Sequence, residues 1–206
     1  DGAFICQNSW GDNFGENGFF YISYYDTNIG THNVVYTDIE NTDNYDHIYQ
    51  SDLCGWVGQL GYNKDSIYGA NVFTAEGNET LKAASFYATG KDSQYELYVV
   101  RQFEDETSLE KMIPVASGKL GNAGYYTVDF NQGIEVDAGE RYAVVLYIIT
   151  PGSVHPMAIE YAADEATENV DLDDGESYIS ANGSKWVSVD TVEKSNLCIK
   201  AFSDNR

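Results

Sequence analysis

One acidic stretch of this chain carries oxygen ligands at a spacing that could suit a metal ion. Residues 169–176 read NVDLDDGE, so carboxylates alternate with apolar residues before a glycine that allows a bend. Ca²⁺ prefers oxygen ligands of this kind. The twelfth position of a calcium loop is normally Glu, but counted from Asp171 it is Asn182. The stretch therefore suggests a loosely held Ca²⁺ and no other cofactor; its candidate ligands are Asp171, Asp173, Asp174 and Glu176.

A second group of side chains could bind sugars. Carbohydrate sites combine exposed aromatic planes with amide and carboxylate groups. Trp56, Tyr62 and Trp186 are the candidates, with Tyr68 as a fourth. The chain has 17 tyrosines, and aromatic residues are common in strands without any ligand. Packing in a core or at a sheet edge is therefore the competing interpretation of each one.

The elements that must position these side chains are strands. From Tyr68 onward, apolar runs recur between turn signals such as Gly-Asn-Glu and Asn-Gly-Ser, in which glycine and asparagine tolerate a positive φ. This spacing favours an all-β fold, an antiparallel β-sandwich of the jelly-roll type. The expected strands are 70–75, 81–88, 95–103, 125–130, 141–150, 157–161, 177–180, 185–189 and 197–202.

Three segments have more specific patterns. Residues 141–150, RYAVVLYIIT, are apolar at successive positions, which indicates a central strand covered on both faces. Residues 107–112 could form one helical turn. Residues 27–52 are rich in Asn and Asp and contain one short strand-like run, at 33–39. We therefore predict a connecting segment before the sandwich.

Residues 2–26, GAFICQNSWGDNFGENGFFYISYYD, have a different organisation. An apolar run ends at Asn8, three glycines mark a turn, and an aromatic strand follows, which is typical of a hairpin with a wide loop. The run N-S-W-G-x-x-F-G-x-x-G-F-F-Y-I resembles the last conserved block of papain-like cysteine peptidases, N-S-W-G-x-x-W-G-x-x-G-Y-F. Phe14 replaces the family's second Trp and keeps its apolar mass.

The resemblance implies roles for two residues of this block. Asn8 would be the third member of a Cys-His-Asn site, its side-chain carbonyl accepting a hydrogen bond from the imidazole N–H so that the other ring nitrogen faces the thiolate. Trp10 would cover that hydrogen bond, because a dry environment strengthens a polar contact and fixes the tautomer.

The resemblance also implies that the other two catalytic residues are not in this chain. In papain-like enzymes the nucleophilic Cys lies on the order of 130–150 residues before this Asn, and the His precedes the Asn as well. Only seven residues precede Asn8 here. We therefore expect residues 1–32 to be the C-terminal remnant of a peptidase domain, processed or truncated at its start and inactive alone.

The second half of the chain has a resemblance of its own. The runs GANVFTA, LKAASFYAT, YELYVV, GYYTVDF, VDAGERYAVVLYI and CIKAF follow one another in the order found in the lectin-like domain downstream of secreted bacterial papain-like peptidases. The similarity extends over residues 45–206. We therefore predict a connecting segment with the first sandwich strands at 33–67 and a lectin-like domain at 68–206.

Charge and cysteine content restrict the remaining possibilities. The chain has 33 acidic and 11 basic residues, a net charge of −22. Phosphate binding needs clustered Lys and Arg, so nucleic acid is excluded as a partner, and an anionic membrane is repelled. No segment approaches the roughly 18 apolar residues of a membrane span. Three cysteines form no disulfide framework, although a Cys6–Cys54 or Cys54–Cys198 bridge stays open.

Two functions follow from these observations. The first is the C-terminal lectin-like region of a secreted or cell-surface C1-family cysteine peptidase, whose partner is the rest of the peptidase domain, in cis or as an associated chain. The second is a stand-alone carbohydrate- or cell-surface-binding module. The apolar residues of the hairpin need to be covered by another protein surface. If the first function is correct, we therefore also expect a homodimer through residues 2–26.

Overall fold

The computed structural model describes residues 2–31, 34–37, 39–173, 176–189 and 193–206. Strands make up 47% of the described residues, and their sheets are antiparallel, which confirms the predicted fold class. Contacts divide the chain into two compact units, Asp1–Asn41 and Thr42–Arg206. No helix among the described residues has the length and apolar character needed to cross a membrane.

The first unit is built on one hairpin. Strand β1 (Ala3–Gln7) pairs antiparallel with β2 (Phe19–Ser23). Side chains alternate across a strand, so the pair Ile5 and Tyr21 lies on one face and the pair Cys6 and Phe20 on the other. Both faces are therefore apolar. Within its own unit the hairpin leaves Ile5 67% and Tyr21 59% exposed.

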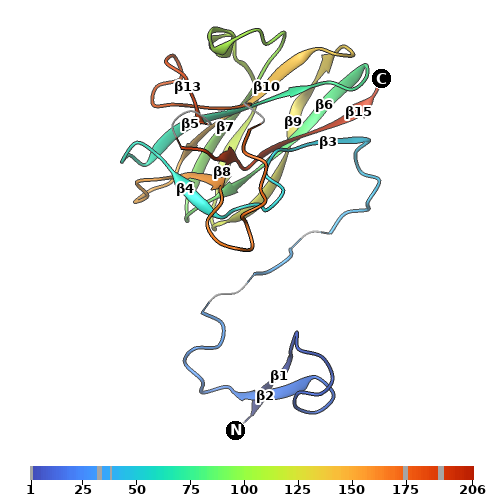
Figure 1. Cartoon of the computed structure of the whole chain (residues 1–206), viewed down its shortest axis with the longest axis vertical. Helices are drawn as coiled ribbons and strands as arrows, with labels where there is room; N and C mark the ends of the chain where they lie inside the picture. Colours follow the sequence, from blue (N-terminus) through green and yellow to red (C-terminus); the bar gives the residue numbers. More distant parts are fainter. Residues whose placement is uncertain (1, 32–33, 38, 174–175, 190–192) are drawn as a thin grey trace. The chain divides into compact units, whose positions relative to one another are not determined.

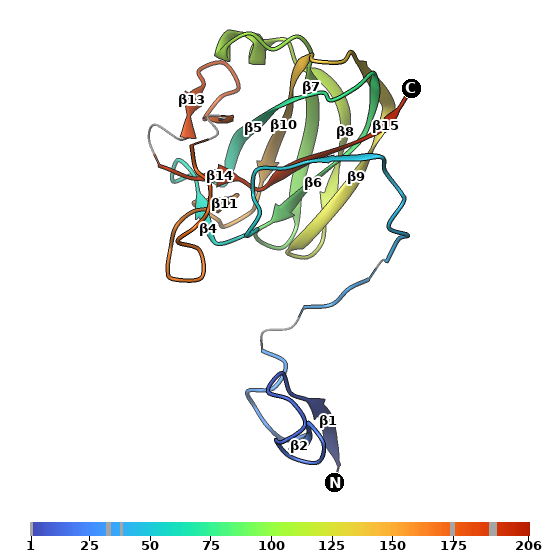
Figure 2. The same cartoon turned by 45° about the vertical axis from the view of Figure 1, so that its right-hand side comes forward.

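The second unit is a β-sandwich (Figures 1 and 2). One sheet has six strands in the order β13-β12-β5-β10-β7-β8, a facing sheet has four in the order β3-β15-β6-β9, and a small sheet has the order β14-β11-β4. The strands are β3 (His47–Tyr49), β4 (Gly58–Leu60), β5 (Ser66–Thr74), β6 (Glu79–Ala88), β7 (Ser93–Val100), β8 (Ile113–Leu120), β9 (Gly124–Val136), β10 (Arg141–Ile149), β11 (Met157–Glu160), β12 (Ser177–Ser180), β13 (Val187–Ser188), β14 (Asn196–Leu197) and β15 (Ile199–Asn205).

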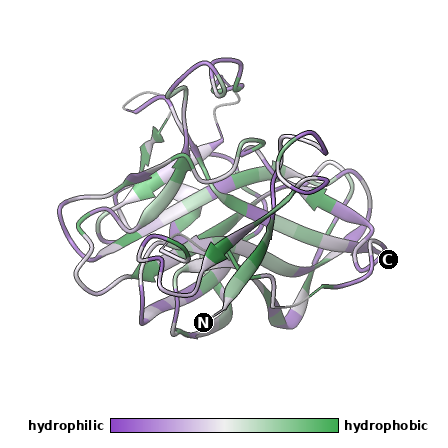
Figure 3. Ribbon diagram, turned by 90° about the horizontal axis from the view of Figure 1, so that it is seen from below, coloured by the Kyte–Doolittle hydropathy of each residue, from purple (hydrophilic) through white to green (hydrophobic). Residues whose placement is uncertain are grey.

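The main core lies between the six-stranded and four-stranded sheets. Leu146 and Ile148 of β10 belong to the same buried cluster as Phe86 of β6 and Ile199 of β15. On its other face, β10 carries Val145 into a second cluster, which packs under the residues around the 3₁₀ turn Glu106–Glu110. The prediction of a central strand covered on both faces is therefore confirmed. Figure 3 shows hydrophobic residues along the strands and hydrophilic ones on many loops.

The structure departs from the predicted elements at two places. Residues 34–37 form no strand, while residues 33 and 38 of that run lie outside the described residues. Strand β8 was not anticipated, because Pro114 and Gly118 weaken its strand pattern. Its position explains why the proline is tolerated. β8 is the edge of the six-stranded sheet and pairs only with β7, so one side of its backbone needs no ladder partner.

The three cysteines are free thiols, so neither of the bridges left open by the sequence is formed. Cys6 lies in the hairpin, Cys54 is exposed, and Cys198 is buried. Burial raises the pKa of the Cys198 thiol, and the nearby carboxylates of Asp52 and Glu160 raise it further. Cys198 therefore serves as a small core residue, as its alternation with apolar neighbours indicates.

Candidate functional site

Asn8 directly follows β1, and both ends of its side-chain amide are held by the hairpin loop. Its Nδ2 donates to the Gly18 carbonyl oxygen at 2.8 Å, and its backbone N–H donates to the same oxygen at 2.9 Å. Its Oδ1 accepts from the Trp10 backbone N–H. An amide oxygen has two acceptor positions, so one remains for a further donor. The loop thus presents a partly exposed carbonyl oxygen in a fixed direction.

Glycine is required at the positions that shape this loop. Gly15 has φ +65°, and a Cβ there would lie 2.1 Å from the Phe19 carbonyl oxygen. Gly18 has φ +87°, and its N–H donates to the Phe14 carbonyl oxygen at 2.9 Å. Only glycine adopts such a φ freely. The spacing of these glycines therefore brings the Gly18 carbonyl to the Asn8 amide.

A row of three aromatic rings runs beside Asn8. Trp10 meets Phe14 edge to face at 5.1 Å between ring centroids, and Phe14 meets Phe20 in the same way at 5.6 Å. Trp10 is nevertheless 76% exposed. Within this unit it covers Phe14, and its remaining surface is open to whatever packs on the hairpin. The role of Trp10 as a shield over an imidazole stays a prediction.

The described residues of this unit hold one cysteine, Cys6, and no histidine; His32 lies outside them. Cys6 lies in β1 opposite Phe20 in the strand register. What the unit offers chemically is an oriented hydrogen-bond acceptor. Such an acceptor fixes the tautomer of a histidine that another segment supplies.

The four acidic residues suggested as calcium ligands are only partly described. Asp174 lies outside the described residues. Asp171 Oδ1 accepts from the Asp173 N–H, and both side chains are exposed. Glu176 forms an ion pair with Arg141 at 3.0 Å. Within the described ranges, no group of three or more His, Cys, Asp or Glu side chains is placed to hold a metal ion. Calcium binding here stays a prediction.

The aromatic candidates are distributed over different parts of the sandwich. Trp56 packs against Tyr87 of β6, in the four-stranded sheet, with ring centroids 5.7 Å apart. Trp186 packs against Tyr68 of β5 and the cluster on the outer face of the six-stranded sheet. Tyr62 is 37% exposed in the loop between β4 and β5. Trp56 and Trp186 thus pack against different sheets, and a ligand role for Trp56, Tyr62 and Trp186 stays a prediction.

Sequence reasoning missed a buried polar cluster between the small sheet and β15. Glu160 is 1% exposed; its Oε1 accepts from Asn196 Nδ2 at 3.0 Å, and its Oε2 accepts from the Cys54 backbone N–H. Asp52 is 1% exposed and pairs with Lys200 at 3.1 Å. The sequence signal for this cluster was Glu160, a glutamate at the end of the apolar run Met-Ala-Ile-Glu. These groups hold residues 51–54 against the sandwich.

Comparisons with known proteins agree with this architecture. A family model described as "Lectin like domain" matches residues 48–203. The structure of a clostridial cysteine protease, Cwp84, after propeptide cleavage superposes with a TM-score of 0.80 at 25% identity, covering 99% of this chain and 52% of that one. No curated protein matches the chain.

A second structure comprises the cysteine protease and lectin-like domains of Cwp84, described as a surface layer associated protein of Clostridium difficile. It matches with a TM-score of 0.77 over 99% of this chain and 46% of that one, and at 24% identity it shows the fold alone. The chain spans about half the length of these solved structures. Because the family model covers most of the sequence, the chain belongs to the lectin-like domain family.

Proposed function

We propose that this chain is the C-terminal, lectin-like accessory region of a secreted, bacterial C1-family cysteine peptidase. Residues 1–32 contribute the end of the peptidase domain, residues 33–67 connect it and begin the sandwich, and residues 68–206 form the lectin-like domain. The likeness to Cwp84, which carries both kinds of domain, supports this arrangement. Its description as surface layer associated supports a secreted or cell-surface location.

The observation that carries the proposal is the fixed amide of Asn8. Gly18 and Trp10 hold the side chain so that Oδ1 keeps one free acceptor position. This is what a Cys-His-Asn site requires of its third member, because the imidazole must keep one tautomer and one orientation throughout the reaction. The Cys and the His come from the remainder of the peptidase domain, in cis or as an associated chain.

The hairpin surface supports the same proposal. An isolated two-stranded hairpin is marginally stable in water, and this one is apolar on both faces. Ile5, Tyr21 and Phe19 are at least 40% exposed within their unit. Strands of this composition belong in the interior of a larger sheet domain. The rest of the peptidase domain supplies that cover; without it, the chain pairs with a second copy through residues 2–26.

The test compares two variants of this chain, produced together with the remainder of the peptidase domain. Asn8→Ala should lower kcat by about 10²-fold with little change in KM, because a misdirected imidazole affects the chemical step. Asn13→Ala, an exposed asparagine of the same loop, is the matched control and should leave kcat unchanged. The chain alone should not cleave peptides. Thiol-dependent cleavage by the chain alone, or full activity of Asn8→Ala, would overturn the proposal.

A second candidate is a carbohydrate- or surface-binding module without catalysis. The observation in its favour is that Thr42–Arg206 forms a compact unit with a core of its own. Solution mass distinguishes the two candidates. If the hairpin awaits a partner, the chain alone dimerises, and Ile5→Glu makes it monomeric. A monomeric wild-type chain that binds glycans would favour the second candidate.

A further inference from the structure

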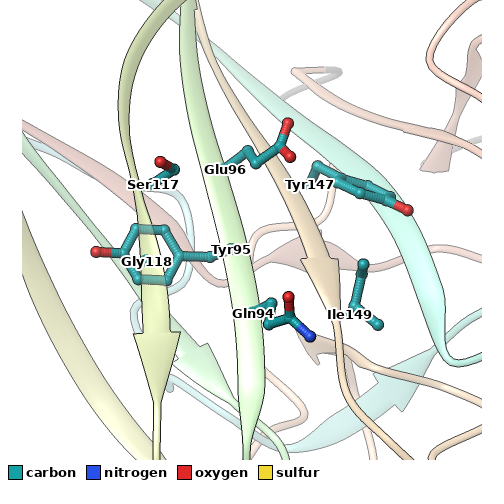
Figure 4. A pocket seen from close by; sticks show the side chains of 7 residues that line it. All are labelled: Gln94, Tyr95, Glu96, Ser117, Gly118, Tyr147 and Ile149. Carbon is teal, nitrogen blue, oxygen red and sulfur yellow. The ribbon is translucent and has the colours of Figure 1, made fainter.

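The outer face of the six-stranded sheet has a covered half and an open half. Leu109 and Phe103 cover Val145 and its neighbours in one half. In the open half, outward side chains of three adjacent strands lie side by side, because Tyr147 is opposite Glu96 in the register, and Glu96 is opposite Ser117. A hollow of about 270 Å³ lies here (Figure 4), lined by Gln94, Tyr95, Glu96, Ser117, Gly118, Tyr147 and Ile149.

One wall of the hollow is an aromatic ring held in place from behind. Tyr147 stacks on Tyr68 of the neighbouring strand with ring centroids 4.2 Å apart and an angle of 22° between the rings. Tyr68 is itself contacted edge to face by Trp186, and Gly183 lies against its ring. The Tyr147 ring is therefore fixed without a ligand, so a molecule that binds against it immobilises no further side chain.

The strands beside Tyr147 carry polar groups that the protein does not use. One carboxylate oxygen of Glu96 accepts from the Tyr98 hydroxyl, which leaves the other oxygen unpaired. The side chains of Gln94 and Ser117 are exposed and have no hydrogen-bond partner among the described residues. Figure 4 shows Gln94 and Glu96 on β7, between Tyr147 and Ile149 on β10 and Ser117 on β8. Donors and acceptors thus lie to one side of the Tyr147 ring (Figure 4).

We propose that this hollow binds a neutral glycan, with a sugar ring against Tyr147 and hydroxyl groups on Glu96, Gln94 and Ser117. The inference deepens the second candidate function, a carbohydrate- or surface-binding module, and rests on it. A sugar presents an apolar C–H face and a polar rim, which is the combination these walls match. The net charge of −22 and the carboxylate of Glu96 disfavour an anionic glycan.

The sheet itself excludes a peptide added as a strand. β7 is paired on both sides, by β10 and β8, and β10 is paired by β5 and β7. Their backbone groups are engaged in these ladders, so a ligand in the hollow meets side chains alone. This distinguishes the site from the free edge of β8, where strand addition would occur.

The experiment titrates the full chain with neutral oligomers of glucose, mannose, galactose and N-acetylglucosamine by calorimetry. The wild type should bind at least one of them, and Tyr147→Ala should weaken binding by about tenfold or more, as expected for loss of a stacking aromatic face. Ser117→Arg fills the hollow from an exposed position and should abolish binding while leaving the melting temperature unchanged. Trp56→Ala and Tyr62→Ala test the competing candidates that the sequence singled out, and both should bind as the wild type does if the hollow is the site.

Two other results would overturn the proposal that the hollow binds a neutral glycan. If Trp56→Ala or Tyr62→Ala abolishes binding while Tyr147→Ala and Ser117→Arg bind normally, the glycan site lies elsewhere and this inference is overturned, while docking on glycans stands. If the wild type binds none of these oligomers at millimolar concentration, the hollow is not a site for neutral glycans. Neither result touches the peptidase proposal, which the Asn8→Ala comparison tests separately.

Discussion

Among the ion pairs of the described residues, the pair of Lys200 with Asp52 is the most deeply buried. The two groups are 3.1 Å apart, and the Asp52 side chain is fully buried while that of Lys200 is 14% exposed. Burial raises the pKa of the Asp52 carboxyl, although the Lys200 ammonium opposes the rise. Removing the lysine would leave a buried carboxylate without its counter-charge.

We predict that Lys200→Met destabilises the sandwich by about 3 kcal/mol at neutral pH, the usual cost of breaking a buried pair from one side. The loss should shrink as the pH falls. A carboxyl whose folded pKa is raised favours the folded state most below its unfolded value of 3.8, and that contribution is lost as the pH rises through the folded pKa. Urea unfolding of both proteins across this range measures the difference.

Lys82→Met is the matched control for this experiment. Lys82 and Asp204 are 3.6 Å apart at the surface, with side chains 45% and 38% exposed. Such a pair contributes at most about 1 kcal/mol and is screened by salt. Equal effects of the two substitutions, or a Lys200→Met deficit that grows in acid, would show that Asp52 is solvated rather than buried.

Asn8 and Asp52 show which single residues can be predicted from the sequence and which cannot. The resemblance picked out Asn8 because all of its partners lie within ten residues, at Trp10 and Gly18. Asp52 looked like one more acid in a polar segment. Its ion-pair partner is Lys200, which is 148 residues away in the chain. A local sequence pattern gives no information about a contact between residues so far apart in the chain.

At the scale of elements, β10 organises the sandwich. It pairs with β5 along its whole length and with β7 from Ala143 to Ile149, and five consecutive residues, 142–146, are buried. Alternate side chains enter two separate clusters, one between the sheets and one beneath the 3₁₀ turn. A polar group placed on either face of this strand would therefore be buried without a partner.

We predict that Val145→Asp unfolds the sandwich. Val145 is fully buried, and an unpaired carboxylate there costs more than about 4 kcal/mol, a large share of the roughly 5–15 kcal/mol that stabilises a typical domain. Val154→Asp, at a loop position 52% exposed, is the control and should keep the melting temperature within a few degrees. Near-ultraviolet circular dichroism checks both. A cooperatively folded Val145→Asp protein would contradict the two-sided burial of β10.

Strand prediction succeeded where one physical signal dominated. The continuous apolar run of β10 reports burial on both faces, which is a property of the strand itself. β8 tolerates a proline and a glycine because it lies at an edge of the sheet, and its edge position depends on the order of the other strands. In the sequence alone, these two residues indicate an interruption of the strand. The hollow on the sheet was missed for a similar reason. Gln94, Glu96 and Tyr147 become neighbours only through the register of β7 with β10.

At the scale of the whole molecule, charge is the dominant property. Even if all 11 basic residues were paired, 22 acidic groups would remain without a counter-charge. The first Lys or Arg is Lys64, so residues 1–63 contain acidic groups but no Lys or Arg. A net charge of this size keeps a protein soluble but opposes its compact state through self-repulsion.

We therefore predict that salt stabilises the chain. Raising NaCl from about 10 mM to about 150 mM shortens the Debye length from about 30 Å to about 8 Å, which screens the repulsion among the excess carboxylates. The melting temperature of the sandwich should rise by several degrees, and most of the rise should occur below about 150 mM. CaCl₂ at matched ionic strength is the comparison: a further rise, reversed by chelator, would reveal a specific ion near Asp171. A melting temperature that falls with NaCl would mean that the ion pairs, and not the excess acidic charge, govern stability.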